Sequence, residues 1–91
     1  MSERRRSFKI TNALGLHLRA AAAFVQMANR FKSEIDVQRE HMRVSGKSLL
    51  GILGLGATQG TELAIIVSGP DEEAALDAIA DLIQNKFGLG E

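Results

Sequence analysis

The residues most capable of chemistry lie in the segment GLHLRA, residues 15–20, where His17 is followed by Arg19. The alanine-rich run that begins at Ala20 predicts a helix, so His17 falls at its mouth. Backbone N–H groups there have no partner within the helix and attract anions, and Gly15 allows the sharp turn that leads in. Arg19 is a cation where the helix dipole alone disfavours one, which makes sense if an anion binds. A neutral imidazole is a good nucleophile near pH 7, so the pair could accept and hold a phosphoryl group. An ordinary helix cap would explain the same pattern.

Two glycine-containing segments and a second histidine are further candidates for a functional site, but each lacks a residue or a context that the function would need. GKS at residues 46–48 lacks the glycine that a phosphate-binding loop needs five positions earlier, where His41 stands. GLGATQ at residues 54–59 has Gln59 in place of the third glycine of a dinucleotide-binding motif. His41 itself lies among charged residues in a predicted turn. We expect two ordinary glycine-containing segments and one solvated histidine.

The hydrophobic periodicity predicts an alternation of strands and helices that could position His17. Strands are expected at residues 7–11, 34–39, 42–44 and 62–67, from alternating or β-branched apolar residues. Helices are expected at residues 18–30, at 47–54, and from Pro70 and Asp71 onward. The apolar stripe of the last helix is expected to consist of Leu76, Ile79, Leu82, Ile83 and Phe87. This order predicts an α+β open-faced sandwich, with one sheet covered by helices on one face.

Composition narrows the functional classes. The 91 residues suffice for one small domain, expected to span residues 1–91. Eleven basic and eleven acidic residues cancel, which disfavours a nucleic-acid partner. Cysteine is absent, which excludes disulfides, zinc–thiolate sites and thiol catalysis and fits a reducing compartment. The longest uncharged apolar run, residues 49–57, is too short to span a bilayer. A cytoplasmic protein without a membrane partner is expected.

Two motifs together resemble a known family. GLHLRAAAAF at residues 15–24 and GKSLLGILGLGATQGTEL at residues 46–63 resemble HPr, the histidine-containing phosphocarriers of the phosphoenolpyruvate-dependent phosphotransferase system. The likeness runs from about Phe8 to Leu89. It implies a four-stranded antiparallel sheet of order 1-4-2-3 with three helices on one face.

The resemblance also implies roles for individual residues. His17 would be the phosphoryl acceptor and Arg19 the residue that steadies the phosphate. Ser48, which by its position also suits a helix cap, would be the site of regulatory phosphorylation. Docking of partners would involve Leu16, Leu18, Leu49, Leu50 and Leu53. The chain departs from the usual pattern at Leu18, where a small residue is common, and at Ala20, where proline is common.

By the same resemblance, Enzyme I would phosphorylate His17, and an EIIA-type domain would receive the phosphoryl group. An HPr serine kinase/phosphorylase is a further possible partner. The protein would be a monomeric carrier with a covalent phosphohistidine rather than an enzyme, and it would need no cofactor or metal. Two alternatives stay open: a small hydrolase of the acylphosphatase type, and an allosteric module that binds an amino acid. Sugar uptake and a nitrogen-linked or regulatory relay are both compatible with the carrier.

Overall fold

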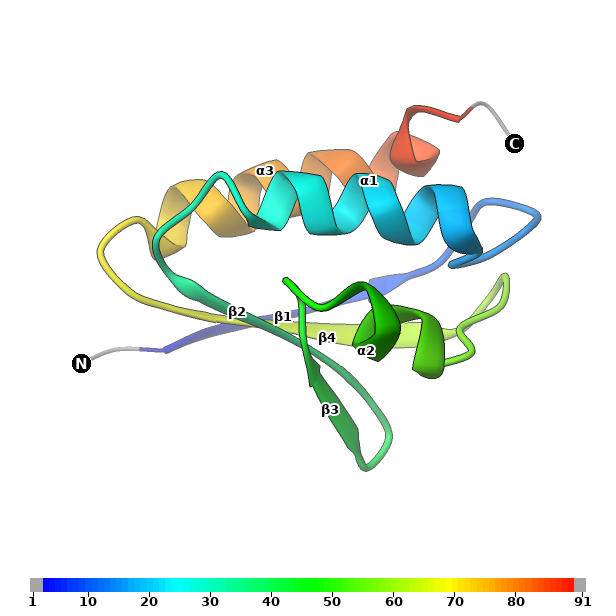
Figure 1. The fold of residues 1–91 in the computed structure, drawn as a ribbon, viewed down its shortest axis with the longest axis horizontal. Coiled ribbons are helices and arrows are strands. Elements are labelled where there is room, and N and C mark those ends of the chain that lie inside the picture. Colours follow the sequence, from blue (N-terminus) through cyan, green and yellow to red (C-terminus); the bar gives the residue numbers. More distant parts are fainter. Residues whose placement is uncertain (1–2, 90–91) are drawn as a thin grey trace.

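One antiparallel sheet forms the base of the molecule. The structure, a computed structural model, describes residues 3–89. Its strands are β1 (Arg4–Lys9), β2 (Glu34–Arg39), β3 (Met42–Ser45) and β4 (Glu62–Ser68), in the order β1-β4-β2-β3. Helices α1 (Leu18–Ala28), α2 (Leu49–Gly54) and α3 (Glu72–Gln84) cover one face, with α1 and α3 side by side and α2 in front (Figure 1). The α+β sandwich, its strand order and its three helices are confirmed.

The core lies between the sheet and the helices. Period-two alternation turns one face of each strand toward the helices, and the small residues of α1 let that helix approach the sheet closely. The strands contribute Phe8, Ile35, Val37, Leu63, Ile65 and Val67, and the two long helices contribute Ala20, Ala21, Phe24, Ala28, Ala75, Ile79, Ala80 and Ile83.

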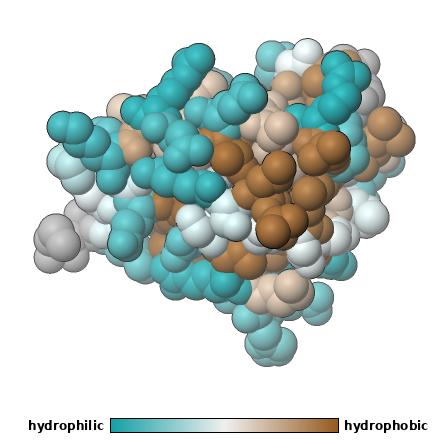
Figure 2. Space-filling view, in the orientation of Figure 1, coloured by the Kyte–Doolittle hydropathy of each residue, from teal (hydrophilic) through white to brown (hydrophobic). Residues whose placement is uncertain are grey.

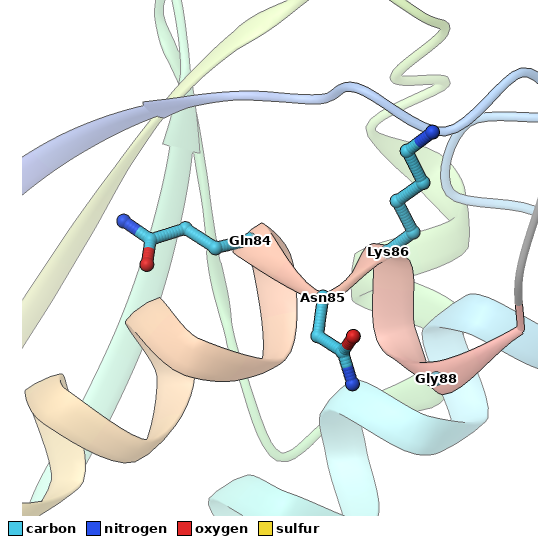
Figure 3. A pocket seen from close by; sticks show the side chains of 4 residues that line it. All are labelled: Gln84, Asn85, Lys86 and Gly88. Atoms are coloured by element: carbon cyan, nitrogen blue, oxygen red, sulfur yellow. The ribbon is translucent and has the colours of Figure 1, made fainter.

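The C-terminal end of α3 differs from expectation. Phe87 was expected in the apolar stripe of the last helix, but α3 ends at Gln84. Lys86, Phe87 and Gly88 all have positive φ, so the chain reverses through a short 3-10 segment, η1 (Lys86–Gly88). This reversal returns Phe87 to the core, where it is buried. The turn leaves an open pocket lined by polar side chains of Gln84, Asn85 and Lys86 (Figure 3).

A carboxylate clasp joins the turn after α1 to the start of α3. Asp71 occupies the N-cap position of α3 but makes no side-chain bond to its own helix. Its carboxylate instead accepts hydrogen bonds from the Ser33 hydroxyl and from the backbone N–H groups of Lys32 and Ser33, the latter two at 2.9 Å. These donors, the Ser33 hydroxyl foremost, lower the pKa of Asp71 to about 2.

Candidate functional site

The loop that carries the histidine depends on a glycine. Gly15 has φ +66°, a conformation that residues with a Cβ rarely adopt. A Cβ at this position would lie 2.5 Å from the carbonyl oxygen of Ala57 and 2.8 Å from Cα of Thr58. The loop before α1 therefore packs directly against the loop after α2, and only glycine permits this approach.

The GLGATQG segment serves as the platform for this contact. The N–H of Leu16 donates to the carbonyl of Ala57 at 2.9 Å. The side chain of Gln59 donates to the carbonyl of Thr11 at 3.1 Å, and the N–H of Gly60 donates to the carbonyl of Ile10 at 2.8 Å. The expectation of an ordinary glycine-containing connection is confirmed for residues 56–60, whereas Gly54 is the last residue of α2.

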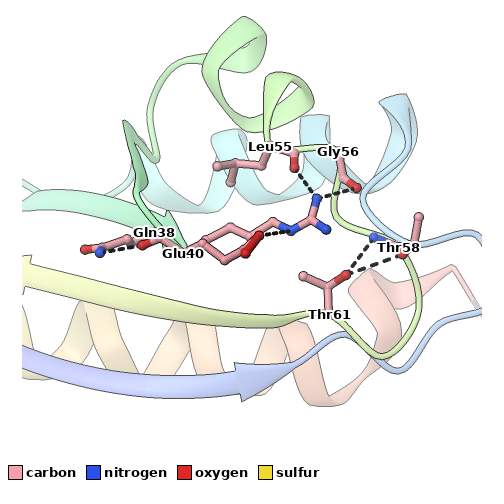
Figure 4. Close-up of polar contacts among 7 residues, drawn as sticks. Gln38, Glu40, Leu55, Gly56, Thr58 and Thr61 are labelled. Carbon is pink, nitrogen blue, oxygen red and sulfur yellow. Dashed lines mark hydrogen bonds and ion pairs between the residues drawn. The ribbon is translucent and has the colours of Figure 1, made fainter.

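Thr61, directly after the platform, closes its turn. The N–H of Thr58 donates to Oγ1 of Thr61 at 3.1 Å, and the N–H of Thr61 donates to the carbonyl of Thr58 at 3.0 Å (Figure 4). The platform is thus held by its own bonds as well as by those to the histidine loop.

His17 occupies the N-cap of α1, as its place before the alanine run predicts. Its backbone is extended, with ψ 179°, and its Nδ1 accepts a hydrogen bond from the N–H of Arg19 at 3.3 Å. The imidazole is half-buried and the Arg19 side chain is exposed. No carboxylate within residues 3–89 forms an ion pair with Arg19. The structure therefore places a nucleophilic nitrogen at a helix N-terminus, two residues before an exposed cation.

The leucines expected to dock partners divide into exposed and buried groups. Leu50 is 82% exposed and Leu49 is 37% exposed, whereas Leu53 packs partly against the core. These three residues of α2 form the leucine patch, and Figure 2 shows apolar atoms gathered over this helix. Leu18, beside the histidine, is 59% exposed.

Leu16 does not belong to the exposed surface. It is only 6% exposed and lies in the core, so its expected place in the docking surface is wrong. The bend at Gly15 turns Leu16 inward and leaves Leu14 outward, at 64% exposed. Sequence reasoning missed Leu14, although two leucines that flank a glycine bend are a signal that one of them faces solvent.

Ser48 caps the short helix. Its Oγ accepts a hydrogen bond from the N–H of Gly51 at 3.1 Å, which confirms the expected N-cap. The hydroxyl precedes Leu49 and Leu50 directly in the chain, so a modification at Ser48 would border the leucine patch.

The remaining candidates contribute no further site. His41 is exposed in the turn between β2 and β3. Within the part of the chain that the structure describes, no group of three or more histidine, cysteine or acidic residues could hold a metal ion. None of the helices among residues 3–89 is long and apolar enough to cross a membrane.

The sequence and the fold are both similar to those of known proteins. Residues 4–85 match the family model described as the PTS HPr component phosphorylation site. The chain belongs to the HPr family. The phosphocarrier protein HPr of Treponema pallidum is 46% identical over 82 residues, which cover 90% of this chain and 93% of that protein.

Solved HPr structures agree with the fold. The crystal structure of HPr-C-His from Thermoanaerobacter tengcongensis superposes with a TM-score of 0.90 at 44% identity, covering 93% of this chain and 96% of that one. The crystal structure of an HPr dimer from the same organism gives 0.76 at 46% identity, covering 89% and 93%. The chain is therefore a phosphocarrier of the phosphotransferase system. The acylphosphatase-type hydrolase and the amino-acid-binding module are excluded.

Proposed function

We propose that His17 is the residue that carries the phosphoryl group, received from phospho-Enzyme I and passed to an EIIA-type acceptor. The observation that supports this most directly is the imidazole at the N-cap of α1, with Nδ1 facing the backbone N–H of Arg19. A phosphoryl group on this nitrogen would lie at the positive end of the helix dipole.

The transfer needs little covalent machinery from the carrier. The N–H of Arg19 first releases Nδ1. The Nδ1 lone pair then attacks phosphorus in line, the bond from phosphorus to the donor breaks, and the three phosphoryl oxygens keep their charge. The exposed guanidinium of Arg19 neutralises that charge. It need not break an ion pair to do so, because it forms none with a carboxylate among residues 3–89. An acceptor nucleophile then attacks phosphorus, the labile N–P bond breaks with its electron pair returning to Nδ1, and the relay is complete.

Partners dock in turn on the exposed leucines. The leucine patch, with Leu18 and Leu14 beside the histidine, offers an apolar surface suited to short-lived contacts. A phosphate on Ser48, added by an HPr serine kinase/phosphorylase, would put a dianion next to this surface and oppose docking. We propose a cytoplasmic monomer that works either in sugar uptake or in a nitrogen-linked or regulatory relay.

Labelling by phosphoenolpyruvate and Enzyme I tests the assignment. The wild-type protein should acquire one label that is lost in acid and survives base, as phosphohistidine does. His17→Ala should abolish the label, whereas His41→Ala, in an exposed turn, should retain it. Full labelling of the His17→Ala protein would refute the proposal.

A further inference from the structure

We propose that Arg39, at the end of β2, is a positioning residue for phosphoryl transfer, because it fixes the leucine patch relative to His17. The proposal rests on the proposed function of His17. Arg39 is not part of the histidine loop or of α2; it donates to backbone carbonyls directly after α2, and the next residue, Ala57, contacts the histidine loop.

The guanidinium of Arg39 is held at the C-terminal end of α2. Its Nη1 donates to the carbonyl of Leu55 at 2.7 Å and to the carbonyl of Gly56 at 3.0 Å, the two acceptors labelled in Figure 4. The Arg39 side chain is 34% exposed, and its contact with Glu40 is long, at 4.0 Å. The short bonds to carbonyls, rather than this surface ion pair, define its position.

The short helix α2 needs support from outside itself. It has six residues, too few for a helix to be stable alone, and no basic residue in its last turn. Ser48 satisfies an N–H at its start. A cation that donates to carbonyls at a helix C-terminus satisfies unpaired acceptors and complements the dipole. Arg39 supplies that cation from a neighbouring strand.

The same contact extends to the histidine loop. Gly56 is followed by Ala57, whose carbonyl accepts the N–H of Leu16, the residue before His17. Gly15 packs against Ala57 and Thr58 at distances that leave no free space. A shift of the chain at Gly56 would therefore move the backbone that carries His17.

Phosphoryl transfer requires a fixed distance between a partner docked on the leucine patch and Nδ1 of His17. A partner that docks on the leucine patch brings its phosphoryl group to a point set by α2, while His17 is placed by the platform loop. Arg39 holds the junction of these two elements. Without it, docking should persist, but the distance from the bound partner to Nδ1 should vary, and small misplacements slow transfer strongly.

Three variants separate this role from a general effect on stability. Arg39→Met keeps an unbranched apolar side chain and removes the guanidinium N–H donors. Arg39→Lys keeps an ammonium that can donate to carbonyls. Arg43→Met is the matched control. Arg43 also lies in the sheet, but it forms ion pairs with the side chains of Asp36 and Glu3, which are not part of the platform.

Single-turnover transfer from phospho-Enzyme I, measured over a range of concentrations, is the readout. For Arg39→Met we expect the maximal rate to fall about fivefold or more while the half-saturating concentration stays within about twofold. Arg39→Lys should recover at least about half of the lost rate, and Arg43→Met should transfer within about twofold of wild type. The Leu16 amide signal in NMR spectra should shift in Arg39→Met only.

The outcomes are distinguishable. Absence of His17-dependent transfer in the wild-type protein would refute the proposed function. Equal maximal rates for wild type and Arg39→Met, or a change confined to the half-saturating concentration, would overturn the role of Arg39 alone. If Arg39→Met does not fold, Arg39→Gln replaces it under the same criteria, since its amide is too short to reach both carbonyls.

Discussion

The N–H of Leu16 donates to the carbonyl of Ala57 at 2.9 Å, which joins the residue before the histidine to the loop that follows α2. Residues 16 and 57, which belong to two separate motifs of the sequence, are therefore joined in one structure. His17 is placed by this junction as much as by the helix that it caps.

Gly15→Ala tests the close approach at the junction. The new Cβ would lie 2.5 Å from the Ala57 oxygen, in a backbone conformation that disfavours side chains. We expect a loss of about 2 kcal/mol or more in the free energy of unfolding. Urea denaturation measures it, and Gly54→Ala is the control because nothing lies within 4 Å of a Cβ there. Equal stability of the two variants would contradict the packing described.

Arg19→Ala should separate transfer from folding. The side chain is exposed, so the free energy of unfolding should change by no more than about 0.5 kcal/mol. Transfer to His17 should slow about tenfold or more, because a charge-assisted contact to the phosphate is lost. Unfolding midpoints and transfer rates on one protein sample check both halves. A large stability loss with normal transfer would reverse the interpretation of Arg19.

Leu50→Glu tests the leucine patch. Leu50 is 82% exposed, so the substitution should leave the fold intact while it weakens Enzyme I binding by more than about 1 kcal/mol. Calorimetric titration measures the affinity. Ala74→Glu places the same charge at an exposed position of α3 and should bind normally. If both variants bind alike, docking does not use this patch.

Ser48 offers a pair of substitutions with opposite expected effects. Ser48→Ala removes the cap on Gly51 and should cost about 1 kcal/mol of stability with little change in docking. Ser48→Asp retains a capping oxygen and adds a charge beside the leucine patch. It should slow phosphorylation of His17 by Enzyme I, and the effect should shrink as salt rises. An unchanged rate at low salt would leave Ser48 as a helix cap only.

The clasp at Asp71 predicts a dependence of stability on pH. Hydrogen bonds from the Ser33 hydroxyl and from backbone N–H groups lower the pKa of Asp71 from its ordinary value of 3.8 to about 2, so the folded state favours the ionised carboxylate. The stabilisation should be complete above about pH 4 and should be lost as the pH falls toward 2. Urea midpoints of the wild type and of Asp71→Asn should therefore differ most above pH 4 and converge toward pH 2. A difference that is constant across this range would rule out the ionised clasp.

Hydrophobic patterns in the sequence predict that a strand or helix exists better than they predict the residues at which it begins and ends. Residues 34–39 were predicted as a strand because Ile35 and Val37 alternate between polar neighbours, and β2 has these bounds. The first strand was predicted to start at Ser7, but it starts at Arg4, because charged residues show no alternation and the extension depends on pairing with β4. Tertiary pairing decided this boundary.

In the candidate site, too, features that depend on neighbouring residues are predictable from the sequence, and features that depend on distant residues are not. The position of His17 at a helix start and the cap at Ser48 follow from neighbours in the sequence, and both were predicted. The burial of Leu16 and the contact of Arg39 with Leu55 depend on residues far away in the chain. Local periodicity cannot predict either contact, because each arises only when distant parts of the chain pack together.

The strand order has a consequence for how the molecule comes into being. β4 pairs with β1 on one side and with β2 on the other, yet it follows both in the chain. As synthesis proceeds, β1 emerges first and has no strand to pair with until residues 62–68 are made. Before that point only the β2–β3 hairpin can form among the strands. Pairings between distant segments form slowly, so neither the complete sheet nor the contacts of the platform with the histidine loop can form before residues 62–68 have been synthesised.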